Sequence, residues 1–230
     1  MSELKTQTFE PIRQNLECGF DPNNVQAGRE PCQHGWYNHV SRTYCQDMTV
    51  LDVGCGMCEG IKIMENNGCK EVHGQEIDSR LSDLHQNIII DKIENIEDNA
   101  YDCVTCFDVI EHVIDDYLFF ENLKRIARKY VFITTPNWTR SHAQNHCHCR
   151  EYTIPQFLNY FEPDEMWSAS PDGCIHLTQL MVKNENGDYV DKTRGNLIWP
   201  EINDDLTFTH STVDGEEWPH HFGIWRLDSA

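Results

Sequence analysis

The sequence is poor in positive charge and has no long apolar run. It carries 18 lysines and arginines against 38 acidic residues, which gives a formal net charge of -20. Such a chain has little with which to displace counterions from phosphates, and this argues against a nucleic-acid partner. A membrane span needs about 18 consecutive apolar residues, and the sequence has no such run. The N-terminus does not show the basic segment, apolar segment and small-residue cleavage site of a secretory signal peptide. We therefore expect a soluble, cytoplasmic protein that binds neither nucleic acid nor membrane.

Cysteine, in contrast, is abundant. The 11 cysteines are odd in number and scattered, which indicates reduced thiols rather than a disulfide framework. Two Cys-x-x-Cys pairs, at 55 and 58 and at 103 and 106, raise the question of a zinc site. The second pair lies in an apolar, strand-like run, where residues three apart point to opposite faces. That pair therefore cannot chelate one ion without breaking the strand.

Strand-like and helix-like segments alternate through the middle of the chain, which predicts an α/β fold with a doubly wound parallel sheet. The length fits a single domain, 1–230, with a lid or leading helices over 1–48, a core over 49–164, and final strands with an insertion over 165–230. The basic run 124–129 is interpreted as a solvated helix face. The predicted strands are 49–54, 71–77, 88–91, 101–110 and 130–137, and the predicted helices are 59–68, 79–87 and 115–129.

The stretch VLDVGCGMCEG joins the first predicted strand to the first predicted helix. Its glycines, Gly54, Gly56 and Gly60, let the backbone approach a ligand, and Glu76 ends the second predicted strand, where an acid binds ribose hydroxyls. This pattern alone does not separate NAD from other adenosine cofactors. Asp52 favours an adenosine cofactor other than NAD, because a carboxylate repels a pyrophosphate but attracts an α-amino group and a sulfonium.

Together with GQEID, YDCVTCFDVIEHV and VFITTPN, this stretch resembles the class I S-adenosylmethionine-dependent methyltransferases. The branch it resembles includes ubiquinone-biosynthesis O-methyltransferases, and the resemblance covers roughly 50–160. It implies a Rossmann-like, mostly parallel, seven-stranded sheet whose last strand is antiparallel. It also implies S-adenosyl-L-methionine as the cofactor and methylation of an oxygen or nitrogen of a small-molecule or sugar-like acceptor.

Eight positions match the family's cofactor site, namely Asp52, Gly54, Cys55, Gly56, Glu76, Asp91, Phe107 and Asp108. The resemblance implies that Asp52, Gly54 and Gly56 line the methionine end, that Glu76 binds both ribose hydroxyls, and that Asp91 meets the adenine amine. The last two residues end the fourth predicted strand beside the cofactor. One position departs from the family, because Cys58 stands where a third glycine is usual. We expect this to change the packing there rather than to abolish binding.

Methyl transfer from a sulfonium is an in-line displacement, so the protein mainly aligns the acceptor and excludes water. An oxygen acceptor also loses a proton, which a histidine can accept at neutral pH. The candidates are His148, in the loop after the fifth predicted strand, His112, in DVIEHV, and His34, in HGWY. A surface or structural histidine is the alternative for each. Glu111 and Glu151 are interpreted either as groups that orient these histidines or as ordinary surface acids.

Three further features are left with open interpretations. His34, with Trp36 and Tyr37, either closes over the cofactor or packs in the core. The His- and Cys-rich run 142–149 is interpreted as a polar loop, with a zinc site made of its histidines and cysteines as the alternative, and no metal ligand is assigned in it. The segment 184–219 either covers the acceptor or makes the contact of a homodimer. Two other functions also remain open, a nicotinamide-dependent oxidoreductase and a non-catalytic partner subunit with this fold.

Overall fold

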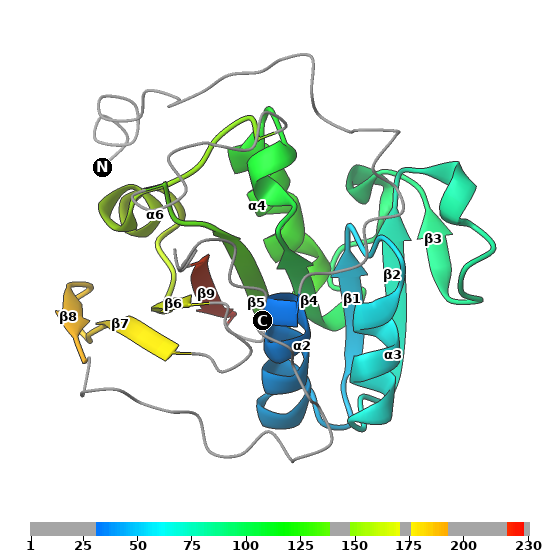
Figure 1. The fold of residues 1–230 in the computed structure, drawn as a ribbon, viewed down its shortest axis with the longest axis horizontal. Helices are drawn as coiled ribbons and strands as arrows, with labels where there is room; N and C mark the ends of the chain where they lie inside the picture. Colours follow the sequence, from blue (N-terminus) through cyan, green and yellow to red (C-terminus); the bar gives the residue numbers. More distant parts are fainter. Residues whose placement is uncertain (1–30, 139–147, 171–175, 193–219, 228–230) are drawn as a thin grey trace.

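Five parallel strands form one part of a nine-stranded sheet, and four strands paired in antiparallel fashion complete it (Figure 1). The computed structural model describes residues 31–138, 148–170, 176–192 and 220–227. The strand order is β3-β2-β1-β4-β5-β9-β6-β7-β8. The strands are β1 Thr49–Val53, β2 Glu71–Glu76, β3 Ile88–Ile90, β4 Tyr101–Phe107, β5 Ala127–Pro136, β6 Glu165–Ser170, β7 His176–Lys183, β8 Tyr189–Asp191 and β9 His220–Arg226.

Helices cover both faces of the sheet, which confirms the predicted doubly wound α/β class. Helices α2 and α3 share one hydrophobic cluster with strand residues such as Val50, and α4 and α6 share another with residues such as Leu51. Successive strand residues thus serve opposite layers, as the period of two requires. The helices are α2 Pro31–Thr43, α3 Glu59–Asn66, α4 Asp116–Ile126 and α6 Ile154–Phe161, and the short 3-10 turns are Ser79–Leu81, Ile93–Asn95 and Ile110–His112.

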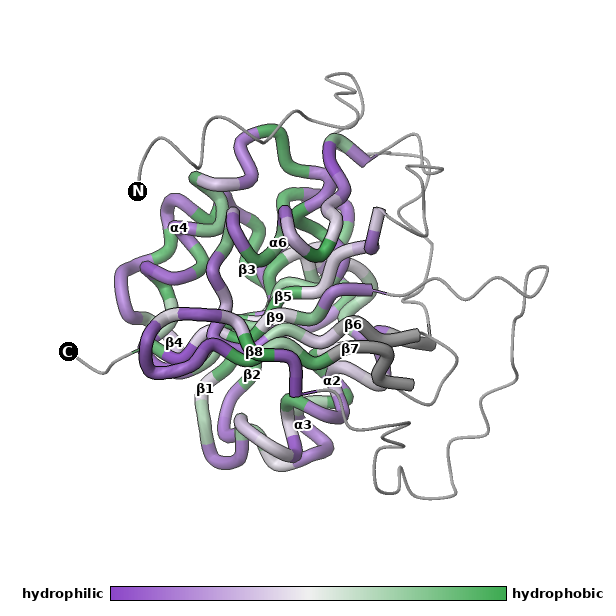
Figure 2. The backbone as a smooth tube through the Cα atoms, turned by 90° about the vertical axis from the view of Figure 1, so that its left-hand side faces the viewer, coloured by the Kyte–Doolittle hydropathy of each residue, from purple (hydrophilic) through white to green (hydrophobic). Residues whose placement is uncertain are grey.

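The buried side chains follow the hydropathy of the chain. Figure 2 shows the hydrophobic residues gathered in the helices and central strands, whereas the turn between β7 and β8 is hydrophilic. The two thiols of β4 obey the same alternation, because Cys103 lies in the α2 and α3 layer and Cys106 in the α4 and α6 layer. The prediction that these two residues cannot bind one ion is therefore confirmed. All seven cysteines whose side chains are described are buried, and none of them forms a disulfide.

The expected seven strands are wrong in number, although the antiparallel last strand is confirmed. β9 pairs antiparallel with β5, and β6 pairs with the other edge of β9, so that β7 and β8 extend the sheet further. A turn at Asn186 and Gly187 closes the β7–β8 hairpin, where Gly187 N–H donates to the Asn184 carbonyl over 2.9 Å. The sheet has more strands than expected because β6 pairs with β9, β7 pairs with β6, and β8 pairs with β7.

The second predicted helix and the length of α4 also needed correction. Only Ser79–Leu81 of the predicted helix 79–87 winds, as a 3-10 turn capped by Asp78. Helix α4 ends at Ile126, and β5 begins at the next residue. The basic run 124–129 is therefore not one solvated helix face. It is divided between the end of a helix and the start of a strand.

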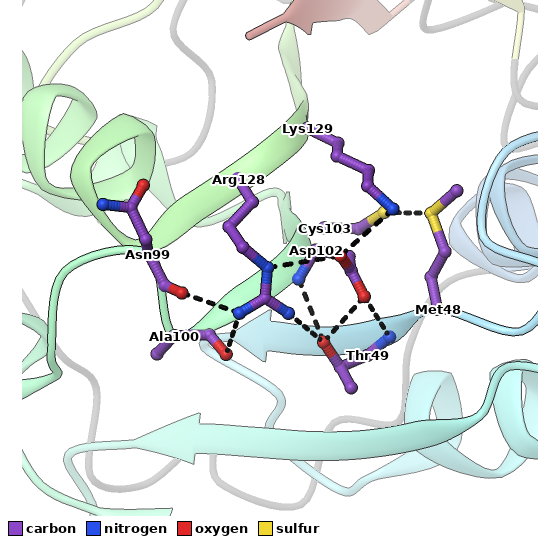
Figure 3. A network of polar contacts seen from close by, with 8 residues as sticks. All are labelled: Met48, Thr49, Asn99, Ala100, Asp102, Cys103, Arg128 and Lys129. Atoms are coloured by element: carbon purple, nitrogen blue, oxygen red, sulfur yellow. Dashed lines mark hydrogen bonds and ion pairs between the residues drawn. The ribbon is translucent and has the colours of Figure 1, made fainter. Parts of the chain in front are cut away.

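The basic residues of β5 serve a polar network at the amino ends of the central strands (Figure 3). Asp102 of β4 accepts hydrogen bonds from the backbone N–H and the hydroxyl of Thr49, each 3.1 Å long. Arg128 and Lys129 each approach the same carboxylate within 3.2 Å. Burial raises the pKa of Asp102, but these hydrogen bonds outweigh it and hold the pKa well below its usual value. The network joins β1, β4 and β5 at the edge opposite the carboxyl ends of the strands.

Several predictions fall on residues outside the described ranges. These concern 1–30, 142–147, and 193–219 of the predicted cover or homodimer contact. Within the part of the chain that is described, no helix is both long enough and apolar enough to cross a membrane.

Candidate functional site

The glycine turn after β1 is built from alternating left-handed residues. Gly54, Gly56 and Cys58 have φ values of 67°, 51° and 63°. A Cβ on Gly54 would lie 2.5 Å from a methyl group of Val109, so neither its φ nor its surroundings admit a side chain. Cys58 adopts a conformation that costs a residue with a Cβ about 1–2 kcal/mol, which explains why glycine is usual there. The turn carries the chain from β1 to the first residue of α3, Glu59.

Asp52 lies fully buried beneath this turn. The hydroxyl of Tyr37 in α2 lies 3.0 Å from each carboxylate oxygen, and the Thr105 hydroxyl of β4 donates to Oδ1 over 2.9 Å. The carboxylate thus joins α2, β1 and β4, and places a negative charge under the turn. Neither partner could be identified from the sequence, because Tyr37 and Thr105 lie 15 and 53 positions from Asp52 along the chain. Its direct contact with a cofactor stays a prediction.

Glu76 ends β2 beside the glycine turn. Its Oε2 accepts a hydrogen bond from Gly56 N–H over 3.2 Å, and its Oε1 accepts one from Ile77 N–H over 2.7 Å. On the next strand, Asp91 follows β3 and accepts from the Asn95 amide over 2.6 Å and from Lys92 N–H over 2.7 Å. The Asn95 and Lys92 bonds lower the pKa of Asp91. Both predicted acids therefore stand at the carboxyl ends of their strands.

Phe107 ends β4 and Asp108 follows it. Phe107 is buried, with its ring 4.7 Å from that of Tyr37. Asp108 has a φ of 55°. Its Oδ1 accepts from the Thr134 hydroxyl over 2.8 Å, and its Oδ2 accepts from the Gln33 amide over 2.5 Å. Helix α2 is thereby tied to the end of β4.

The residues at this edge of the sheet fit a cationic cofactor. Four carboxylates stand at or near the carboxyl ends of β1, β2, β3 and β4, and these are Asp52, Glu76, Asp91 and Asp108. Ligands of open α/β sheets bind outside this edge. Four negative charges would repel a pyrophosphate and attract a sulfonium and an ammonium group. These four carboxylates therefore fit S-adenosylmethionine better than a nicotinamide dinucleotide.

Glu111, His112 and His148 gather close to one another at the same edge of the sheet. One ligand atom from each lies within 4.8 Å of the others, and the imidazole rings of His112 and His148 are 4.8 Å apart at 80°. Glu111 is fully buried, and its Oε2 accepts from the Thr135 hydroxyl over 3.2 Å. Its Oε1 has no hydrogen-bond partner among the described residues. Burial, reinforced by the nearby charge of Asp108, raises the pKa of Glu111 well above its usual value.

Backbone hydrogen bonds hold the segment that carries His148 against the end of β4. Cys149 N–H and Arg150 N–H both donate to the Glu111 carbonyl, over 2.6 and 3.1 Å. Nδ1 of His148 lies 2.5 Å from Oε1 of Glu151, which is itself buried. Of the two roles considered for Glu151, orientation of a histidine is the one this contact supports. The sequence did not reveal that Glu111 and His148, 37 positions apart, would meet.

Asp116, at the first turn of α4, anchors the same segment. Its carboxylate accepts hydrogen bonds from Arg150 over 2.7 Å, from the Tyr152 hydroxyl over 2.6 Å and from the Tyr160 hydroxyl over 2.8 Å. Asp116 is buried. Sequence reasoning missed this residue, since an acid in the first turn of a helix is ordinary. Its three partners fix the chain on the C-terminal side of His148.

The aromatic residues near His34 serve packing. Trp36 is buried and stacks on Phe222 of β9 with ring centroids 4.4 Å apart, and Tyr37 is buried against Asp52. His34 lies 2.9 Å from Glu59 at the start of α3. The alternative that this group packs in the core is therefore the one observed.

Comparisons with known proteins agree with this geometry. A family model described as a methyltransferase domain matches residues 37–169. The ubiquinone biosynthesis O-methyltransferase of Rickettsia typhi is 26% identical, over 63% of this chain and 64% of that protein. The chain thus matches less than two thirds of this relative's length.

Two solved structures share the fold. They are S-adenosylmethionine-dependent methyltransferases from Archaeoglobus fulgidus and Thermotoga maritima, with TM-scores of 0.55 and 0.51. The first is 16% identical, over 85% of this chain and 92% of its own. The second is 9% identical, over 86% of this chain and 92% of its own.

Proposed function

Because the chain belongs to the methyltransferase domain family, in the class I S-adenosylmethionine-dependent group, we propose that it methylates an oxygen or nitrogen of a small-molecule or sugar-like acceptor. The observation that supports this most is the row of carboxylates at the carboxyl ends of β1 to β4. S-adenosylmethionine supplies an activated methyl group when it is bound. The protein's own part is to hold this cofactor and align an acceptor with it.

In this proposal the cofactor lies over the glycine turn, with Glu76 toward its ribose. Gly54 and Gly56 keep the turn free of side chains. The buried charge of Asp52 lies below, where it favours the cationic methionine end through its field. Asp91 stands one strand farther out, at the adenine end.

The acceptor would occupy the space beside His112 and His148. The acceptor atom forms a bond to the methyl carbon while the bond from that carbon to sulfur breaks, and an oxygen acceptor also releases a proton. We propose that His148 activates the acceptor, because Glu151 fixes Nδ1 and leaves Nε2 for this task. The similarity of the chain to the ubiquinone biosynthesis O-methyltransferase of Rickettsia typhi is compatible with an oxygen acceptor.

Calorimetric titration of the purified chain tests this function. We expect S-adenosylmethionine and S-adenosylhomocysteine to bind and NAD and NADH not to bind. Binding of NAD(H) alone would favour an oxidoreductase. Failure to bind S-adenosylhomocysteine would favour a non-catalytic partner subunit. Once an acceptor is known, His148→Ala should lower turnover and leave cofactor affinity unchanged, and a normal rate would remove His148 from this role.

A further inference from the structure

We infer that Glu111, His112 and His148 bind one divalent first-row transition-metal ion, and that His148 activates the acceptor as a ligand of this ion. This inference deepens the proposed function, because it states how the acceptor end of the site works. Ion binding itself requires neither cofactor nor acceptor. It can therefore be tested separately from methyl transfer.

The first argument is the convergence of three ligand atoms. One atom from each residue lies within 4.8 Å of the other two, a spacing that a central ion would close to ordinary ligand distances with small side-chain movements. Ligands that share a zinc ion at about 2.0–2.2 Å are separated by roughly 3–3.5 Å. Glu111 and His112 are adjacent in the 3-10 turn Ile110–His112 that follows β4, and His148 is brought to them by the hydrogen bonds of Cys149 and Arg150 to the Glu111 carbonyl.

The second argument is the unsatisfied oxygen of Glu111. Oε1 is buried and has no hydrogen-bond partner in the described ranges, although Oε2 is bonded to Thr135. A buried acceptor without a partner costs about 1–3 kcal/mol. A cation between this oxygen and the two imidazoles would satisfy it. The same ion would offset the repulsion between Glu111 and Asp108.

The third argument is the contact between His148 and Glu151. A metal-binding histidine usually gives its other ring nitrogen to a carboxylate, which fixes the tautomer and makes the ligand more basic. Glu151 makes this contact at Nδ1, 2.5 Å away, and is itself buried. Nε2 is then the nitrogen that serves as ligand. The arrangement of His148 is therefore that of a ligand with its supporting carboxylate.

The donor set points to the class of ion. Two imidazoles and one carboxylate suit Zn²⁺, Mn²⁺, Fe²⁺ or Co²⁺, whereas Mg²⁺ and Ca²⁺ prefer sites made of oxygen atoms. Three protein ligands leave positions open for a further molecule. An acceptor hydroxyl bound there would have a lower pKa, because the cation stabilises its deprotonated form. Its proton would pass to water as the new carbon–oxygen bond forms, and so the site favours an oxygen acceptor.

Cobalt is the probe we would use to test this site. The full chain is stripped with EDTA, returned to chelator-free buffer with reductant, and titrated with Co²⁺ by calorimetry and visible absorption. We expect one ion per chain, with the weak bands of nitrogen and oxygen ligands and without the intense near-ultraviolet band of cobalt–thiolate coordination. An intense thiolate band would overturn the assignment, since the ion would then lie on cysteines.

Variants decide whether these three residues are the ligands. His112→Ala, His148→Ala and Glu111→Gln should each weaken Co²⁺ binding by more than tenfold, and S-adenosylhomocysteine affinity should stay unchanged, which shows that the fold is intact. His73→Ala is a matched control, because His73 pairs with Glu71 in β2, and it should bind Co²⁺ normally. A second control, His146→Ala, probes the neighbouring His-rich run.

Three results would contradict the inference. Absence of Co²⁺ binding to the wild-type chain would mean that Glu111 is simply held protonated. Binding that survives all three ligand substitutions would also overturn it, as would binding lost in His146→Ala alone. Because S-adenosylhomocysteine affinity is measured in parallel, failure of the metal site is distinguishable from failure of the proposed cofactor.

Discussion

Oε2 of Glu76 accepts a hydrogen bond from the backbone N–H of Gly56 over 3.2 Å. The contact joins the end of β2 to the turn after β1, two features that lie 20 positions apart in the sequence. It holds a carboxylate over the turn, where the proposed cofactor would place its ribose. The same carboxylate also accepts from Ile77 N–H, so backbone donors on two sides set its orientation.

Replacing Glu76 should weaken cofactor binding. Glu76→Ala removes charge-assisted hydrogen bonds to the ribose, which are worth about 1.5–3 kcal/mol, so S-adenosylhomocysteine affinity should fall by more than tenfold. Glu71→Ala, at the exposed start of the same strand, is the control and should bind normally. Unchanged affinity in Glu76→Ala, measured by calorimetry, would mean that the ribose lies elsewhere.

The turn itself should not tolerate a side chain at Gly54. Gly54→Ala combines a left-handed φ of 67° with a Cβ 2.5 Å from Val109. Gly187→Ala has a φ of 85° but no atom within 4 Å of its Cβ. Urea unfolding should show a loss of about 1 kcal/mol from the conformation alone at Gly187, and a further 1–3 kcal/mol from overpacking at Gly54. Equal losses of unfolding free energy in the two variants would show that the glycine turn after β1 accommodates a side chain without a packing cost.

The buried charge of Asp52 should depend on Tyr37. Tyr37→Phe removes a hydroxyl that lies 3.0 Å from both carboxylate oxygens. A hydrogen bond to a charged group contributes about 1.5–3 kcal/mol, and we expect the free energy of unfolding to fall by that amount. Tyr130→Phe, whose ring stacks on Phe132, is the control and should lose less. A loss no larger than the control's would show that Asp52 is supported by its other partners.

Stability should decrease as the solution is acidified below pH 6.5. His221 of β9 is fully buried, and its Nε2 donates to the Tyr152 carbonyl over 2.8 Å. Burial lowers the pKa of His221 from 6.5 to about 4, although the bond to Tyr152 opposes this shift. The unfolded chain therefore takes up a proton near pH 6.5, whereas the folded chain does not until about pH 4. The free energy of unfolding should fall across this window by on the order of 3 kcal/mol from this group.

Two histidine variants separate the contribution of His221 to acid stability from that of the other titratable groups. His221→Gln should flatten the dependence of the unfolding free energy on pH between 6.5 and 4. His85→Gln, which replaces a histidine near Glu65, should keep the wild-type slope. Parallel slopes in wild type and His221→Gln would show that burial of His221 does not control acid stability.

Local signals in the sequence were enough for the first half of the sheet. The run that ends in Asp52 and the glycines after it predicted β1 and its turn, because a buried strand and a left-handed turn each leave a mark within a few residues. The same signals overstated the helix predicted over 79–87, of which only Ser79–Leu81 winds. They also extended α4 into 127–129, because the amphipathic pattern continued past the point where Arg128 and Lys129 pair with Asp102.

The antiparallel half could not be predicted in this way. β9 comes last in the chain and lies between β5 and β6. No local pattern in its residues says which strands it will join, since each pairing depends on hydrogen bonds to a distant segment. The count of nine strands rather than seven follows from those pairings.

The sequence by itself determined the α/β class, the glycine turn and the acids at the ends of the parallel strands, because periodicity and spacing encode these within short segments. Only the tertiary structure decided that Tyr37 and Thr105 hold Asp52, that Asp116 anchors the segment beyond His148, and that His148 meets Glu111. Those contacts join residues tens of positions apart, and they form only when the carboxyl ends of β4 and β5 are brought to one edge of the sheet.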